Sequence, residues 1–126
     1  MRAMVVDDSK AMRMILKRLL VDCGYDELLE GVDGRDALDQ IVAMADSELP
    51  GLMLVDWNMP NMNGLEFVTE IRKLARCRLT VLVMITTETA VERIQMALDA
   101  GADEYMMKPF TKEVLLEKLE LIKAGM

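Results

Sequence analysis

The chain has 126 residues, of which 52% are hydrophobic and 29% are charged, and its formal net charge at pH 7 is −7. This length and composition are typical of one globular domain with a core of its own. The acidic balance argues against nucleic acid or an anionic membrane as a direct partner, because binding to phosphates needs clustered lysine and arginine. The apolar runs are too short to span a bilayer.

The sequence contains no histidine, which excludes histidine-dependent triads, imidazole metal sites and phosphohistidine carriers. The spacing of Cys23 and Cys77 fits no zinc motif, and we expect both to be reduced thiols. The first residues, MRAMVVDDSK, turn acidic at Asp7, which is not the pattern of a signal peptide. We therefore expect a cytoplasmic protein whose chemistry depends on acids, hydroxyls and lysines.

In chain order, short apolar runs alternate with amphipathic stretches. Five strands are predicted, at residues 3–6, 27–32, 52–55, 80–85 and 104–107. Each is followed by apolar residues at helical spacing: Met12, Ile15, Leu16, Leu19 and Leu20; Leu38, Ile41, Val42 and Ala45; Phe67, Val68, Ile71 and Ala75; Ala90, Ile94, Ala97 and Leu98; Leu115, Leu119 and Ile122. The helices are predicted to start at Ser9, Asp33, Asn63, Thr89 and Thr111, and stop signals are Gly24, Gly101 and Gly125.

This alternation predicts an α/β fold in which a five-stranded parallel sheet has helices on both faces. Strands that are buried on both faces explain unbroken apolar runs such as LMLV at 52–55. In open sheets of this kind the ligand crevice lies beyond the carboxyl ends of the strands. The residues that directly follow the strands are therefore the candidates for function. They are Asp7 and Asp8, Asp33, Asp56 to Asn58, Thr86 and Thr87, and Lys108 with Pro109.

Three carboxylates, Asp7, Asp8 and Asp56, follow the first and third predicted strands. One Asp or Ser9 would be enough to cap the first helix, and the helix after Asp56 begins only at Asn63. If the two strands are neighbours, these carboxylates converge, and a pair about 4 Å apart repels by about 4 kcal/mol at an effective dielectric of about 20. Such a cluster needs a cation, and oxygen ligands without histidine or cysteine favour Mg²⁺.

Lys108 and Thr86 complete the set of polar groups at the strand ends. Lys108 follows the apolar residues YMM, where burying an ammonium group needs a partner. Thr86 adds a hydroxyl after the fourth strand. A nucleophilic carboxylate, metal-binding acids, a hydroxyl and a cation together indicate phosphoryl transfer onto an aspartate, where catalysis is largely positioning and charge neutralisation.

Several motifs together resemble the receiver domain of two-component response regulators, in particular the single-domain chemotaxis regulators. They are VVDDS (5–9), DWNMPNMNG (56–64), ITTET (85–89), AGADEYMMKPFT (100–111) and the tail with EKL and KAGM. The resemblance covers residues 1–126 as one receiver domain without an output domain. It implies the flavodoxin-like (βα)5 fold with strand order 2-1-3-4-5.

The resemblance also implies roles for individual residues. Asp56 would accept a phosphoryl group from a histidine kinase. Mg²⁺ would be bound by Asp8 directly, by Asp7 mainly through water, by Asp56, and by the backbone carbonyl of Asn58. Lys108 would pair with a phosphoryl oxygen, and the peptide bond between Lys108 and Pro109 would be cis.

Thr86 and Tyr105 would form a switch pair. The Thr86 hydroxyl would bond to the phosphoryl group and the Tyr105 ring would swing inward, which biases a two-state surface that already exists. The surface of the fourth helix, fifth strand and fifth helix, including Tyr105 and Lys118, would bind a target such as the flagellar motor switch protein. The implied protein is a monomeric switch that dephosphorylates slowly, with a phosphatase as a further partner. The alternative within the family is a phosphorelay intermediate.

Other protein classes fit less well. Haloacid-dehalogenase-like phosphohydrolases also use an Asp after a strand, but the second acid that they place two residues later is Asn58 here. A flavodoxin-like FMN carrier would have a loop rich in Ser and Thr in place of DDSK, and the G-x-x-x-x-G-K-[ST] motif of an NTPase is absent. Two positions depart from the family pattern: Thr87 replaces a small residue, and Asn63 stands where Asp is common. Trp57 is expected to be a partly exposed aromatic residue in a loop.

Overall fold

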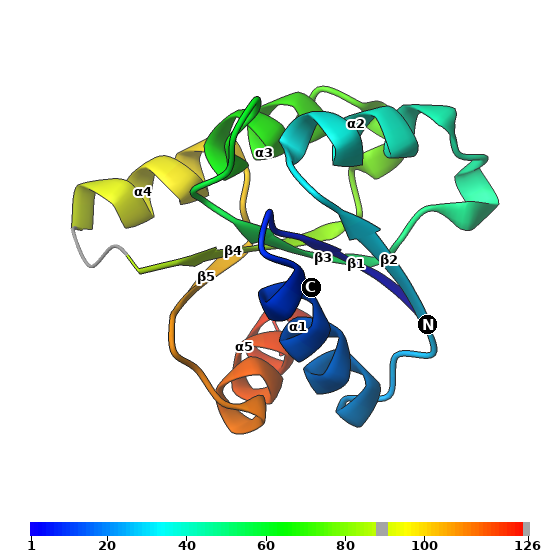
Figure 1. Ribbon diagram of the computed structural model, residues 1–126. Coiled ribbons are helices and arrows are strands. Elements are labelled where there is room, and N and C mark those ends of the chain that lie inside the picture. The colour runs from blue at the N-terminus through cyan, green and yellow to red at the C-terminus, as the bar shows by residue number, and fades with distance from the viewer. Residues whose placement is uncertain (88–90, 125–126) are drawn as a thin grey trace.

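A computed structural model describes residues 1–87 and 91–124, and Figure 1 shows a sheet between two layers of helices. The strands are β1 (Arg2–Val6), β2 (Glu27–Gly31), β3 (Leu52–Asp56), β4 (Val81–Thr86) and β5 (Glu104–Met107). The α-helices are α1 (Lys10–Asp22), α2 (Gly34–Ala43), α3 (Gly64–Arg72), α4 (Val91–Ala100) and α5 (Lys112–Ala124). Short 3-10 helices, η1 (Asp46–Glu48) and η2 (Ala75–Cys77), precede β3 and β4.

The sheet is parallel with strand order β2-β1-β3-β4-β5, so the predicted fold class and topology are confirmed. β1 lies next to β3 with Val6 opposite Val55. β3 lies next to β4 with Asp56 opposite Ile85. The carboxyl ends of the three central strands therefore meet at one edge of the sheet.

Apolar side chains cover both faces of the central strands. In β3, Met53 and Val55 pack into a core with α2, α3 and α4, whereas Leu52 and Leu54 pack into a second core with α1 and α5. Figure 1 shows the same division, with α1 and α5 below the sheet and the other three helices above it. Every residue of β3 is buried, which explains why this strand has no polar alternation.

The predicted helix starts are confirmed wherever the structure describes them. Ser9, Asp33 and Asn63 each accept a hydrogen bond from a backbone N–H of the first turn, which satisfies a donor that the helix itself leaves open. Thr111 accepts one from Val114 at 3.3 Å. Thr89 and the predicted stop at Gly125 lie outside the described residues.

Some details differ from the expectation. β4 includes Thr86, whereas the sequence placed this residue directly after the strand. Ile15, Val42 and Leu98 occur at helical spacing but are exposed, because they lie at the margin of the apolar stripe of their helices. Cys23 and Cys77 are free thiols, as predicted.

Among residues 1–87 and 91–124, no helix has the length and apolar character that crossing a membrane requires.

Candidate functional site

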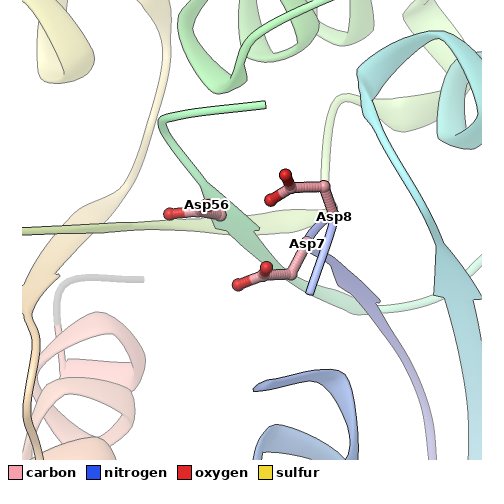
Figure 2. Close-up of side chains that lie close together, drawn as sticks. All are labelled: Asp7, Asp8 and Asp56. Atoms are coloured by element: carbon pink, nitrogen blue, oxygen red, sulfur yellow. The ribbon is translucent and has the colours of Figure 1, made fainter. Parts of the chain in front are cut away.

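The three predicted carboxylates converge at the carboxyl end of the sheet. Asp7 and Asp8 directly follow β1, and Asp56 is the last residue of β3. Asp7, Asp8 and Asp56 each offer an oxygen atom, and these atoms lie within 4.8 Å of one another. Figure 2 shows the three side chains extending in the same direction from the two strand ends. Asp7 and Asp56 are buried and Asp8 is exposed, so the cluster opens to solvent on one side.

Lys108 neutralises part of this charge. Its Nζ lies 3.1 Å from Asp56 Oδ1 and 3.4 Å from Asp7 Oδ2, and it donates a hydrogen bond to each. The Lys108 side chain is only 18% exposed, so the partner that the sequence required for a buried ammonium is present. The peptide bond from Lys108 to Pro109 is cis, as expected from the resemblance.

The electrostatic balance of the cluster remains negative. Burial raises the pKa of Asp56 above its usual value, the Asp7 carboxylate raises it further, and Lys108 opposes both effects. Three carboxylates and one ammonium leave two negative charges without a partner in the cluster. The donor set consists of oxygen atoms only. These groups fit a hard divalent cation such as Mg²⁺.

Asp7 is fixed by contacts that the sequence did not reveal. Its Oδ1 accepts a hydrogen bond from the backbone N–H of Ser9 at 2.9 Å, so Asp7 also supports the start of α1. Its backbone carbonyl accepts a hydrogen bond from Arg13 Nη1 at 2.7 Å. Arg13 in turn forms an ion pair with Glu30 on β2. Arg13 was missed because an arginine in an amphipathic helix resembles an ordinary surface residue.

The other predicted site residues lie on β4, β5 and α5 and in the loop after β3. Thr86 is buried at the end of β4, and its backbone carbonyl accepts a hydrogen bond from the Lys108 N–H at 3.0 Å. Tyr105 on β5 is half-buried beside the core formed with α2, α3 and α4. Lys118 Nζ lies 4.9 Å from the centre of the Tyr105 ring, a cation–π contact. Asn58 is exposed in the loop after β3.

The expectation for Trp57 was wrong. This side chain is only 4% exposed and belongs to the core between the sheet and α2, α3 and α4. The guanidinium of Arg93 on α4 lies 5.4 Å from the centre of its ring. A loop position next to a polar site suggested exposure, but the ring turns inward and packs in a core that includes residues of α2 and α4, which are distant in sequence.

Comparison with known proteins decides which family this geometry represents. The model of the response regulator receiver domain matches residues 3–120. The chain belongs to the response regulator receiver domain family. A receiver domain is a signalling switch rather than an enzyme in the usual sense. Membership of this family therefore argues against the alternative of a haloacid-dehalogenase-like phosphohydrolase.

The relatives of this receiver domain include chemotaxis proteins. Chemotaxis protein CheY1 of Helicobacter pylori is 43% identical over 122 residues, which are 97% of this chain and 96% of that protein. A chemotaxis protein CheY homolog of Campylobacter jejuni is 42% identical over 120 residues, 95% of this chain and 90% of that protein. The solved structure of Vibrio cholerae chemotaxis protein CheY4 has a TM-score of 0.83 at 36% identity. The match covers 96% of this chain and 97% of the CheY4 chain. The receiver domain is thus of the chemotaxis regulator type.

Proposed function

We propose that this receiver domain accepts a phosphoryl group on Asp56 from the phosphohistidine of a histidine kinase. The observation that carries the proposal is the pair of contacts from Lys108 to Asp56 and Asp7, because it places a cation beside the buried carboxylate that would accept the phosphoryl group. Arrangement and charge neutralisation are the main requirements of phosphoryl transfer.

The proposed reaction replaces a P–N bond of the kinase by a P–O bond to Asp56. A carboxylate oxygen of Asp56 attacks the phosphorus atom, and a P–O bond forms while the P–N bond of the phosphohistidine breaks. The electron pair of that bond goes to the imidazole nitrogen, which takes up a proton. Lys108 pairs with a phosphoryl oxygen, and the Thr86 hydroxyl donates a hydrogen bond to another.

Asp7, Asp8, Asp56 and the backbone carbonyl of Asn58 are the proposed ligands of Mg²⁺. When bound, the ion supplies positive charge that offsets the negative charge of the phosphoryl oxygens. The uncompensated charge of the cluster supports this assignment. The raised pKa of Asp56 supports it too, since burial and Asp7 disfavour the free carboxylate that the reaction needs.

The test uses the full chain, a small acyl phosphate as donor and intact-mass spectrometry. We expect the wild type to gain the mass of one phosphoryl group when Mg²⁺ is present and not when it is chelated. Asp56→Asn should stay unlabelled, whereas Asp39→Asn, an exposed Asp on α2, should label as the wild type does. Equal labelling of Asp56→Asn and the wild type would refute the proposed acceptor.

We further propose that phosphorylation changes the surface of α4, β5 and α5 through Thr86 and Tyr105, and that this surface binds the flagellar motor switch protein. Both helices contact β5. All three elements carry large apolar side chains that are exposed to solvent, which is typical of a surface that binds protein. They include Val91, Leu98, Met107, Val114 and Leu121.

Binding measurements distinguish the two alternatives within the family. Calorimetry should show tighter binding of a motor-switch peptide after phosphorylation, with loss of that gain in Tyr105→Ala. Binding of a histidine phosphotransfer domain alone would replace the chemotaxis role by that of a phosphorelay intermediate. The cytoplasmic location, the monomeric state, the single-domain organisation and a phosphatase partner stay predictions.

A further inference from the structure

The loop between β3 and α3, residues 57–63, carries a proposed metal ligand but lies outside the sheet. Asn58 in this loop is exposed, so packing around its own side chain does not fix it. The loop closes on itself through a hydrogen bond from the Gly64 N–H to the Trp57 carbonyl at 2.9 Å. Asn61 near its tip has a φ of 65°, in the left-handed region. The start of the loop is anchored at Trp57, whose N–H donates a hydrogen bond to the Ile85 carbonyl at 3.0 Å and whose side chain is buried, so the part beyond Asn58 is the part that needs a further contact.

Asp33, which is separated from the end of β2 by Val32 alone, provides a contact of this kind. Its Oδ1 accepts a hydrogen bond from the Asp36 N–H at 2.8 Å, which caps α2. Its Oδ2 accepts a second hydrogen bond from Asn61 Nδ2 at 2.7 Å. One oxygen is enough for the cap, so the second bond is a separate interaction. The hydrogen bond from the Asp36 N–H lowers the pKa of Asp33 most, and the hydrogen bond from Asn61 lowers it further. The Asp33 carboxylate is therefore charged at neutral pH.

Gly34 adds a second contact between the same two loops. Its N–H donates a hydrogen bond to the Met62 carbonyl at 3.0 Å. A Cβ at position 34 would lie 2.6 Å from that carbonyl oxygen and 2.8 Å from Met62 Cγ, so this approach requires glycine. Consecutive residues of one loop therefore bond to consecutive residues of the other. The start of α2 thus holds the tip of loop 57–63 at two adjacent residues, through the side chain of Asn61 and the backbone carbonyl of Met62.

We propose that Asp33 is a positioning residue that holds loop 57–63 and, through it, the Asn58 carbonyl at the metal site. This inference rests on the proposed function. Asp33 is not part of the carboxylate cluster itself, which consists of Asp7, Asp8 and Asp56 in the part of the chain that the structure describes. Asp33 would act through loop 57–63 and not by contact with the metal, as outer partners of metal ligands commonly do.

The main test is Asp33→Ser in the full chain. Serine retains a cap for α2 but is too short to reach Asn61 as well. Because outer partners affect metal affinity by about 10- to 100-fold, and this one acts through a backbone segment, we expect the dissociation constant for Mg²⁺ to rise about tenfold. Trp57, the only tryptophan, gives the fluorescence signal. At saturating Mg²⁺ the rate of labelling by an acyl phosphate should stay within about twofold of wild type, a split that loss of the fold would not produce.

Two further variants separate the bond from other causes. Asn61→Gly keeps the left-handed backbone and removes the donor, and it should raise the dissociation constant by a similar factor. The double variant should be no worse than either single one, because both remove the same bond. Asp36→Asn is the matched control: it removes one negative charge from the same turn and leaves the bond from Asn61 to Asp33, so Mg²⁺ affinity should not change.

The outcomes distinguish the inference from the proposed function. If the wild type neither binds Mg²⁺ nor becomes labelled on Asp56, the proposed function fails. If the wild type does both, and Asp33→Ser and Asn61→Gly bind Mg²⁺ within about twofold of wild type, the positioning role is refuted. An equal loss in Asp36→Asn would also refute it, because the effect would then follow from net charge.

Discussion

Replacing Asp56 by asparagine should make the protein more stable when Mg²⁺ is absent. Asp56 and Asp7 have oxygen atoms within 4.8 Å of each other, a separation at which two charges repel by about 3.5 kcal/mol at an effective dielectric of about 20. Lys108, at 3.1 Å, attracts Asp56 by about 5 kcal/mol on the same scale. Asp8 is exposed, so solvent screens most of its repulsion. The charge interactions therefore leave a net attraction of about 1.5 kcal/mol at most, from which the screened repulsion of Asp8 is subtracted.

Burial then decides the sign of the effect. Burial is the largest cause of the raised pKa of Asp56, so the folded protein disfavours this charge. Asparagine has nearly the same shape and no charge. Lys108 keeps Asp7 as a partner after the substitution. We expect Asp56→Asn to raise the free energy of unfolding by about 1–2 kcal/mol at about pH 7, because the substitution removes a buried charge while Lys108 keeps Asp7 as its partner and is not left unpaired.

The pH dependence provides an independent check. Because the folded protein has the higher pKa at Asp56, it binds more protons there than the unfolded chain, and wild-type stability from this group falls as pH rises. The advantage of Asp56→Asn should therefore grow as pH rises from the ordinary value of 3.8 through the raised pKa, and then stay constant. Urea unfolding followed by circular dichroism, with a chelator, measures this difference at each pH.

The same substitution at exposed Asp8 is the matched control. Asp8→Asn removes an equal charge from the same cluster, but solvent already screens that charge, so the gain should be clearly smaller. Two results would refute the reasoning: an Asp56→Asn variant that is less stable than wild type without Mg²⁺, or a difference in stability that does not change between about pH 4 and about pH 7.

Three other predictions concern the core, the thiols and the metal. Phe67→Ala should lower the free energy of unfolding by about 3–5 kcal/mol, because Phe67 is fully buried, whereas Leu79→Ala, at a side chain that is 78% exposed, should change it by less than about 0.5 kcal/mol in the same urea titration. In the native protein at neutral pH, a thiol reagent should modify half-buried Cys23 faster than buried Cys77. In urea the two thiols should react at similar rates. Equal rates in the native protein would contradict the described burial. Mg²⁺ at about 100 times its dissociation constant should stabilise the wild type by about 2.7 kcal/mol and Asp56→Asn by less, as a thermal shift would show.

Much of the fold could be predicted from local patterns. The runs in β1, β3 and β4 are apolar because both faces of these strands are covered, and the carboxyl-end rule then placed Asp7, Asp8 and Asp56 at one edge of the sheet. Their convergence also required β1 and β3 to be neighbours, and that strand order was implied by the family resemblance. A partner for Lys108 was predicted because an ammonium group that follows an apolar strand is costly to bury unpaired. These predictions succeeded because strand direction and strand order together determine where the side chain after each strand lies.

The features that escaped prediction depend on contacts between distant segments. Asp33 and Asn61 each have a local explanation, as a helix cap and as a turn residue, and nothing nearby indicates the bond between them across 28 positions. The burial of Trp57 likewise depends on how the helices pack over it, and its cation partner Arg93 lies on α4. Sequence patterns report on backbone geometry, whereas these contacts depend on how the loops and helices meet.

The position of Lys108 in the chain has a consequence for how the site is assembled. It is 101 residues from Asp7 and 52 residues from Asp56, and it follows β5, the last strand of the sheet. Until β5 has paired with β4, the two buried carboxylates face each other without their cation, which opposes closure of the crevice. A chain that is still being synthesised, or a fragment that ends before residue 108, thus lacks a complete site. Labelling of Asp56 should therefore report, in one measurement, that all five strands have been assembled from first to last.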